Sequence, residues 1–469
     1  MPRARCAIAG FGLLLITACT GGGSGDRASP SDNASAPISS ASSDPPSSAP
    51  ATGGSDPAAA DWPQYHGDSQ RTGVSKAMPI SSGRLSLDSV VLDGPVYASP
   101  IIVAGTVIVA TEHNVVYGLD LSGQQRWKVN LGAPTPRSKL PCGNIDPLGI
   151  TGTPVYDGTS GSVFLVASTG DRVSHQLFAL DPATGAPRWH RSVDLPGADP
   201  QAMQQRAALA IAGGRVWVPF GGLAGDCGDY KGRLVGVPLT NGEPISYTVP
   251  TTREGGIWTP PGPTVLGNDL LVAVGNGEST GNTYDFSDSV LRVRDGRLVD
   301  SFSPTTWAPD NAADLDLGSQ GPALVNNRWV FQAGKSGTGY VLAADRLGGI
   351  GGQVWQGEVC RSFGGTAVAG DTVYVPCADG LRAVRIDGSG HAEIRWHAAK
   401  SVAGSPVVGG GRVYAVDIDA GALVALDPTT GRQRERVSVG AVSRFATAAI
   451  SGSRLYLPTL AGLAIVNSG

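Results

Sequence analysis

The side chains most able to do chemistry lie in the middle third of the chain. Trp258 is followed by Asn276 in a Gly-Asn-Gly stretch, by an acidic run that includes Asp314 and Asp316, and by Lys335. Amide and carboxylate oxygens are the ligands that a hard cation prefers, and a positioned carboxylate can accept a proton. A structural interpretation also stands, because Gly-Asn-Gly is a turn signal and an acidic loop is typical of a solvated surface.

Neither the cysteines nor the histidines have the spacing of a metal site. The chain has 6 cysteines and 6 histidines, but no C-x-x-C pair and no paired histidines, so a zinc site is not predicted. Four cysteines lie beyond the leader. We predict that they form the disulfides Cys360–Cys377 and Cys142–Cys227 in an oxidising compartment, with buried free thiols as the alternative.

Charge and motif content argue against several other functions. The net charge is −4, only 16% of residues are charged, and there is no basic run, so nucleic acid is not an expected partner. The chain has no G-x-S-x-G elbow, and its Gly-Lys-Ser triplet at Gly334 lacks the first glycine of a phosphate loop.

The first residues have the features of an export signal. Arg3 and Arg5 precede an apolar run over residues 7–16, which is too short to span a bilayer but suits a signal peptide. The run ends in Ile-Thr-Ala-Cys, which resembles the lipobox of bacterial lipoproteins. We therefore expect residues 1–18 to be a lipoprotein signal peptide and Cys19 to carry a lipid that anchors the exported protein to the extracytoplasmic face of the membrane. An ordinary secretory signal is the alternative.

Residues 19–60 differ in composition from everything that follows. They are rich in Ser, Pro, Ala and Gly and contain no aromatic residue. Such a segment cannot bury enough apolar surface to offset the entropy of ordering. We predict a disordered stalk that connects the membrane to a domain over residues 61–469.

That domain is built from repeats of short β-rich runs separated by turns. In the first copy, runs of Val, Ile and Tyr begin near Ser99, Thr106, Val115 and Gln125, and each is bounded by Gly or Asp. Similar units return along the chain, each long enough for the four strands of one propeller blade. The last copy lacks a fourth strand, and an unmatched run over residues 84–92 precedes the first copy. We predict an all-β, eight-bladed propeller of four-stranded blades, closed by this N-terminal strand; an open sandwich is the alternative.

One turn carries a further signal. Residues 179–189 read A-x-D-x-x-T-G-x-x-x-W, with weaker copies near Trp127, Trp396 and Asp427. This pattern resembles the tryptophan-docking motif of the pyrroloquinoline quinone (PQQ) dehydrogenases, the quinoprotein alcohol dehydrogenase-like propellers. We expect these tryptophans to be core residues that fill gaps between blades.

The resemblance extends to the middle third of the chain, in residue type and order. It implies that Trp258 forms the floor beneath a quinone and that Lys335 contacts it. Either Asp316 or Asp314 would act as the base. It implies calcium as well as PQQ as cofactor, with Asn276 and Asp316 as metal ligands and Asp226 in place of the family's glutamate.

Two departures bear on that resemblance. The family has adjacent cysteines near the quinone, whereas this chain has the single Cys142, and Asp226 is out of register with the family's glutamate.

Two hypotheses about function follow. One is a non-catalytic binding or scaffold lipoprotein of the cell envelope with a degenerate quinone site, partnered by an envelope protein or a small ligand. The other is a PQQ- and calcium-dependent dehydrogenase of an alcohol or sugar that passes electrons to an external acceptor.

Overall fold

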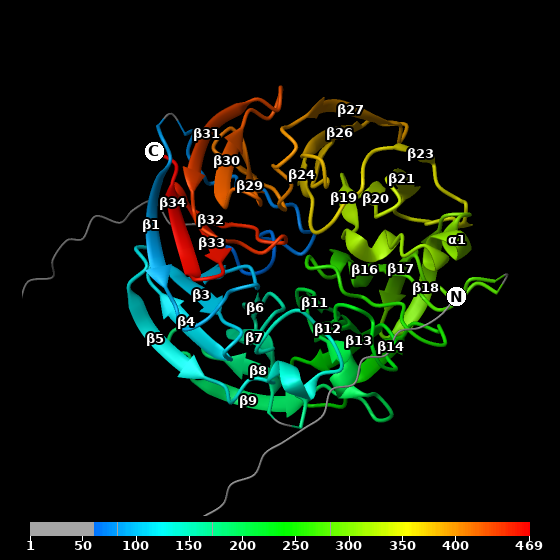
Figure 1. Ribbon diagram of the computed structural model, residues 1–469, viewed down its shortest axis with the longest axis horizontal. Helices are drawn as coiled ribbons and strands as arrows, with labels where there is room; N and C mark the ends of the chain where they lie inside the picture. The colour runs from blue at the N-terminus through cyan, green and yellow to red at the C-terminus, as the bar shows by residue number, and fades with distance from the viewer. Residues whose placement is uncertain (1–60, 82, 171, 282) are drawn as a thin grey trace, which may run out of the picture. The chain divides into compact units, whose positions relative to one another are not determined.

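The structure is a computed structural model that describes residues 61–469 except 82, 171 and 282. Within this part of the chain, eight β-sheets stand in a ring (Figure 1), and most of them are formed by consecutive strands only. The predicted all-β, eight-bladed propeller is confirmed. Apolar residues alternate with turns at short, regular intervals, and each blade buries its inner strands against its neighbours.

The first four blades follow the predicted repeats. Blade 1 comprises β2 (Ile101–Val103), β3 (Thr106–Ala110), β4 (Val115–Leu119) and β5 (Gln125–Asn130). Blade 2 comprises β6 (Val155–Asp157), β7 (Ser162–Thr169), β8 (Ser174–Leu180) and β9 (Pro187–Ser192). Blade 3 comprises β10 (Met203–Gln204), β11 (Ala210–Ala212), β12 (Arg215–Gly222), β13 (Arg233–Pro238) and β14 (Ile245–Thr248). Blade 4 comprises β15 (Thr264–Leu266), β16 (Asp269–Val274), β17 (Ser289–Arg294), β18 (Arg297–Ser303) and the added edge strand β22 (Gly349–Ile350).

The other four blades complete the ring. Blade 5 comprises β19 (Ala323–Val325), β20 (Trp329–Ala333), β21 (Thr338–Ala343) and β23 (Trp355–Glu358). Blade 6 comprises β24 (Ala367–Ala369), β25 (Thr372–Val375), β26 (Arg382–Ile386) and β27 (Ala392–His397). Blade 7 comprises β28 (Val407–Gly409), β29 (Arg412–Asp417), β30 (Ala422–Leu426) and β31 (Gln433–Ser438). Blade 8 comprises β32 (Ala449–Ser451), β33 (Arg454–Thr459), β34 (Gly462–Asn467) and β1 (Ser86–Val91). The helical pieces are η1 (Arg137–Lys139), η2 (Pro200–Ala202), α1 (Trp307–Ala312) and η3 (Leu317–Ser319).

Blade 8 closes the ring as predicted from the sequence. β1 pairs antiparallel with β34, in register from Ser86 opposite Asn467 to Val91 opposite Gly462. Figure 1 shows this blue strand beside the red C-terminal strands. The pairing covers the edge that β34 would otherwise expose, and it ties the beginning of the propeller to its end.

Two of the predicted docking tryptophans join neighbouring blades. Trp127 of blade 1 donates from Nε1 to the carbonyl of Pro182 in blade 2 at 3.1 Å. Trp396 of blade 6 makes the same bond to Pro428 of blade 7 at 2.8 Å. A Cβ at Gly185, which follows Pro182, would lie 2.3 Å from the Trp127 ring, so this turn needs glycine. The motif therefore acts between blades, and these two tryptophans are core residues.

A segment that the repeats do not predict runs through the ring before β1, and we call it the crossing segment. Residues 62–75 contact every blade. The contacts, in blade order, join Trp62 to Ile102, Pro63 to Tyr156, Arg71 to Leu209, Ser69 to Val265, Gln70 to Asn327, Thr72 to Val368, Ser75 to Val408 and His66 to Thr447. Arg71 and His66 are almost wholly buried. Burial lowers the pKa of His66 to about 3, so this imidazole is neutral.

The predicted signal peptide (1–18), lipidated Cys19 and stalk (19–60) lie outside the described residues. Among the residues that are described, no helix has the length and hydrophobicity needed to cross a bilayer.

Candidate functional site

A cavity of about 580 Å³ lies among the loops that lead into the innermost strands. This cavity is lined by Tyr97, Trp258, Asp316, Phe363 and Phe445, each a few residues before the first strand of a blade, and by Arg206, which lies between β10 and β11 of blade 3. Tyr97, Arg206 and Phe445 also line a small void with Tyr65 of the crossing segment, so that segment lies directly behind the cavity. The cavity has the size of a small-molecule site.

One side of the cavity holds the carboxylates that the sequence analysis singled out. Nζ of Lys335 lies 2.7 Å from Oδ1 of Asp314 and 2.7 Å from Oδ2 of Asp316. The other oxygen of Asp316 accepts the backbone N–H of Asn276. We call Asp226, Asp314, Asp316, Asn276 and Lys335 the acidic wall.

The two carboxylates that share Lys335 have different surroundings. The side chain of Asp316 is 5% exposed, whereas that of Asp314 is 70% exposed. Burial raises the pKa of Asp316, although the Lys335 charge opposes the shift. Burial alone would lower the pKa of Lys335, but the charges of Asp316 and Asp314 outweigh it and raise that pKa. The interpretation of this run as a solvated loop is therefore wrong for Asp316 and right for Asp314.

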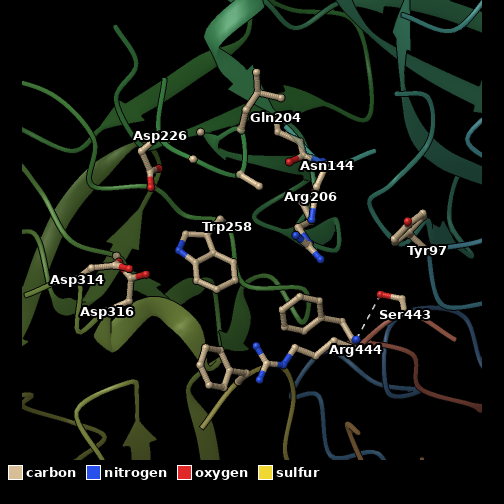
Figure 2. A pocket seen from close by; sticks show the side chains of 18 of the residues that line it. Tyr97, Asn144, Gln204, Arg206, Asp226, Trp258, Asp314, Asp316, Ser443 and Arg444 are labelled. Carbon is tan, nitrogen blue, oxygen red and sulfur yellow. Dashed lines mark hydrogen bonds between the residues drawn. The ribbon is translucent and has the colours of Figure 1, made fainter. Parts of the chain in front are cut away.

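Trp258 lies beside this acidic wall. A Cβ at Gly275 would lie 2.6 Å from Oδ1 of Asp316 and 3.0 Å from Nε1 of Trp258, so the close approach of the three depends on glycine. The ring of Trp258 is half-buried and meets the Phe445 ring edge-on at 6.3 Å. In Figure 2, Trp258 stands between Asp314 and Asp316 on one side and Arg206 on the other.

Asp226 lines the cavity next to a disulfide. Its carboxylate accepts a hydrogen bond from Tyr230 Oη, and burial together with the Asp226 charge raises the pKa of Tyr230. Cys142 and Cys227 are bonded, with Cα atoms 5.9 Å apart. This bond ties the loop of Asp226 to the loop of Asn144, which also lines the cavity.

Both predicted disulfides are present. Cys360 and Cys377 form the second, with Cα atoms 5.7 Å apart, and join blade 5 to blade 6. The fold brings together every residue that the resemblance implied for a site, because Asp226, Trp258, Asn276, Asp314, Asp316 and Lys335 all line the one cavity.

The opposite side of the cavity was not predicted from the sequence. The guanidinium of Arg206 lies 4.3 Å from the centre of the Phe445 ring, and that of Arg444 lies 4.1 Å from the centre of the Phe363 ring. We call these four residues the arginine wall. A signal existed, because Arg206, Phe363 and Phe445 each lie four residues before an inner strand, in the same kind of loop as Trp258.

The acidic wall is arranged around Lys335 and not around an open cation site. Across the described parts of residues 61–469, no group of three His, Cys, Asp or Glu residues is placed to hold a metal ion. One oxygen of Asp316 is paired with Lys335, and the other accepts the N–H of Asn276. The ammonium thus lies against a carboxylate whose oxygens a cation would need. Ligation by Asn276, Asp316 and Asp226 stays a prediction that requires this wall to rearrange.

The ring of eight blades, the tryptophan-docking turns between blades and the central cavity together define an eight-bladed, PQQ-like β-propeller. The chain belongs to the family described as outer membrane protein assembly factor BamB, whose model matches residues 69–199, 100–294 and 337–468. A search of curated protein sequences finds no match.

Solved structures of two kinds share the fold. Quinohemoprotein alcohol dehydrogenase from Comamonas testosteroni has a TM-score of 0.65 and 17% identity, over 87% of this chain and 80% of that one. A europium-containing methanol dehydrogenase has a TM-score of 0.65 and 15% identity, over 87% and 98%. BamB from Moraxella catarrhalis has a TM-score of 0.56 and 19% identity, over 82% and 97%. At these identities the likeness establishes the fold alone.

Disulfides form and persist in oxidising compartments, so the two bonds indicate an extracytoplasmic protein.

Proposed function

We propose that this chain is a non-catalytic binding protein of the cell envelope, anchored by a lipid on Cys19, whose central cavity takes a small ligand. One observation carries the proposal: Lys335 holds both Asp314 and Asp316 at 2.7 Å within a cavity of about 580 Å³. The site is thus a degenerate quinone site, in which the Lys335 ammonium is already paired with both carboxylates.

The carboxylate that would act as base supports the same conclusion. A general base needs a free oxygen within reach of the proton that it accepts. Asp316 directs one oxygen to Lys335 and the other to the backbone N–H of Asn276. Asp314 is 70% exposed and shares the same ammonium. Asp316 is thus shielded but paired, and Asp314 is exposed, so neither carboxylate combines burial with freedom from an ion pair.

The convergence of residues favours a second candidate, a PQQ- and calcium-dependent dehydrogenase of an alcohol or sugar. Trp258 would then be the quinone floor, Lys335 a quinone contact and Asp316 or Asp314 the base. PQQ would supply the oxidation, while the protein would orient it. This candidate requires Lys335 to release Asp316, and it requires an external electron acceptor.

Titration with PQQ, with and without calcium, separates the two candidates. We expect no calcium-dependent change in quinone absorbance upon addition of simple alcohols or sugars to the full chain. Quinone reduction that needs calcium and disappears in Asp316→Asn would establish the dehydrogenase and overturn the non-catalytic proposal. PQQ binding that is lost in Trp258→Ala would also support the dehydrogenase, and Trp355→Ala, on the outer strand β23, is the matched control.

The anchor is tested separately by membrane fractionation. Cys19→Ala should release the exported protein from the membrane fraction, because the lipid would have no attachment point. Cys6→Ala, which removes the other leader cysteine, should leave the protein anchored. A Cys19→Ala protein that stays with the membrane would contradict the lipid anchor, without bearing on the cavity.

The family also makes an envelope protein a candidate partner, since its description is that of an assembly factor. A scaffold role and a ligand-binding cavity are compatible, because a partner would engage the outer surface and a ligand the centre of the ring. Chemical crosslinking in cells, followed by purification of the chain, would test whether such a partner exists.

A further inference from the structure

The arginine wall has positive charges that the protein itself does not neutralise. Among the described residues, neither the partly buried Arg206 nor the exposed Arg444 has a side-chain hydrogen bond or an ion pair. Each guanidinium is instead stacked on a phenylalanine, at 4.3 and 4.1 Å from the ring centres. Stacking orders the guanidinium plane and leaves its N–H edges free to donate.

The carboxylate behind Arg206 does not fill this role. Oε2 of Glu112 accepts the backbone N–H of Gly149 at 2.7 Å and the hydroxyl of Thr151 at 3.1 Å. Glu112 is wholly buried, and burial raises its pKa to about 7. Its charge is therefore only partly present at neutral pH, and its side chain does not line the cavity.

Electrostatics on this wall favour an added anion. Burial lowers the pKa of Arg206 to about 10. Burial lowers the pKa of Arg444 as well, and the neighbouring charge of Arg361 adds to that effect. Both groups would be stabilised by a counter-charge. In Figure 2 both arginines lie away from Asp226, Asp314 and Asp316, across the Trp258 ring, so an anion placed there is kept apart from the aspartates.

We propose that the arginine wall binds the oxyanion group of a small organic ligand, with Arg206 and Arg444 as donors and the Trp258 and Phe445 rings against its apolar body. This deepens the proposed function and rests on it. Planar guanidinium edges match the two oxygens of a carboxylate or phosphate. The acidic wall repels a second anionic group, so the ligand bears its negative charge at one end.

Calorimetric titration of the full chain with four simple probes tests the inference. Benzoate and phenyl phosphate carry the oxyanion on an apolar ring, benzyl alcohol is their neutral counterpart, and inorganic phosphate lacks the ring. We expect at least one of the two aromatic anions to bind at least about tenfold more tightly than benzyl alcohol, since charged hydrogen bonds contribute that much. The stronger of the two identifies a carboxylate or a phosphate as the preferred group.

Two variants and a matched control locate the binding. Arg206→Gln and Arg444→Gln should each weaken anion binding about tenfold. Arg328→Gln should not, although its guanidinium also stacks on a ring, that of Trp329 at 4.8 Å, outside the cavity lining. Thermal melts of all three show whether they fold.

Several results would overturn the inference. The first two are that benzyl alcohol binds as tightly as benzoate, or that inorganic phosphate binds as tightly as phenyl phosphate. The third is that folded Arg206→Gln and Arg444→Gln keep the affinity of the parent protein. The fourth is that neither aromatic anion shows saturable binding at millimolar concentration. If benzyl alcohol binds as tightly as benzoate and its binding is lost in Trp258→Ala, the binding function stands and only the oxyanion inference fails.

Discussion

The two walls of the central cavity hold charge in opposite ways. On the acidic wall, Lys335 is ion-paired with both Asp314 and Asp316, and Tyr230 donates to Asp226. On the arginine wall, Arg206 and Arg444 are supported by aromatic rings and by no carboxylate. A charge withdrawn from water is costly unless it is paired. The acidic wall is the more complete of the two, because each of its charged members has a partner within the protein.

The difference shows which residues serve the fold and which are available to a ligand. A complete network resists change, because removing one member leaves the others buried and unpaired. An incomplete one gains free energy when something binds. The residues with the strongest resemblance to a catalytic set belong to the complete wall, and the residues that the resemblance did not include belong to the incomplete one.

The largest effect on the free energy of unfolding should come from the disulfide beside Asp226 of the acidic wall. In Cys142→Ser/Cys227→Ser, the free energy of unfolding should fall by about 4 kcal/mol, because the bond closes a long loop and restricts the unfolded chain; the two cysteines are 85 residues apart. Cys360→Ser/Cys377→Ser, with a separation of 17, should lose about 3 kcal/mol. Denaturant unfolding measures both, and a smaller loss from the longer loop would contradict the entropic account.

Lys335→Met tests whether the acidic wall depends on its ammonium. We expect a loss of about 3 kcal/mol, since Asp316 would remain buried without a partner. Asp314→Asn should cost less than about 1 kcal/mol, because that carboxylate is largely exposed. Urea unfolding of the two variants decides the matter. If they lose the same amount, the acidic wall is not the coupled network described above.

Glu112→Gln examines the carboxylate behind the arginine wall through pH. The pKa of Glu112 is raised from 4.5 to about 7 in the folded protein, so the folded state holds a proton that the unfolded state releases between these values. Stability should therefore fall as pH rises through this window, by about 3 kcal/mol from this group. The melting temperature, measured at several pH values across this window, should change less with pH in Glu112→Gln than in the parent protein. An increase in stability with pH that the variant abolishes would mean that ionised Glu112 is the counter-ion of Arg206.

The smallest effect should come from the arginines themselves. Because neither side chain is paired within the described structure, Arg206→Gln and Arg444→Gln should change the free energy of unfolding by less than about 1 kcal/mol. Chemical denaturation without ligand provides the measurement. A loss as large as that of Lys335→Met would remove the contrast between the two walls.

Much of the architecture is determined by the sequence itself. Strand and turn patterns are local, so the repeats specified eight blades, and the unmatched run at residues 84–92 specified how β1 closes blade 8. The disulfides followed from where the cysteines fall relative to those repeats. The resemblance then selected Trp258, Asn276 and Lys335, and the fold places all three in one cavity.

Other properties depend on which loops the closed ring brings together. Asp314 and Asp316 are two residues apart, yet only tertiary packing makes one exposed and the other buried. Arg206 and Phe445 are far apart in the sequence and meet because both precede innermost strands. The crossing segment contains no repeat pattern, so only the structure shows its contacts with every blade. Periodicity records which way a side chain points within its own strand, whereas burial and pairing depend on neighbours from other blades.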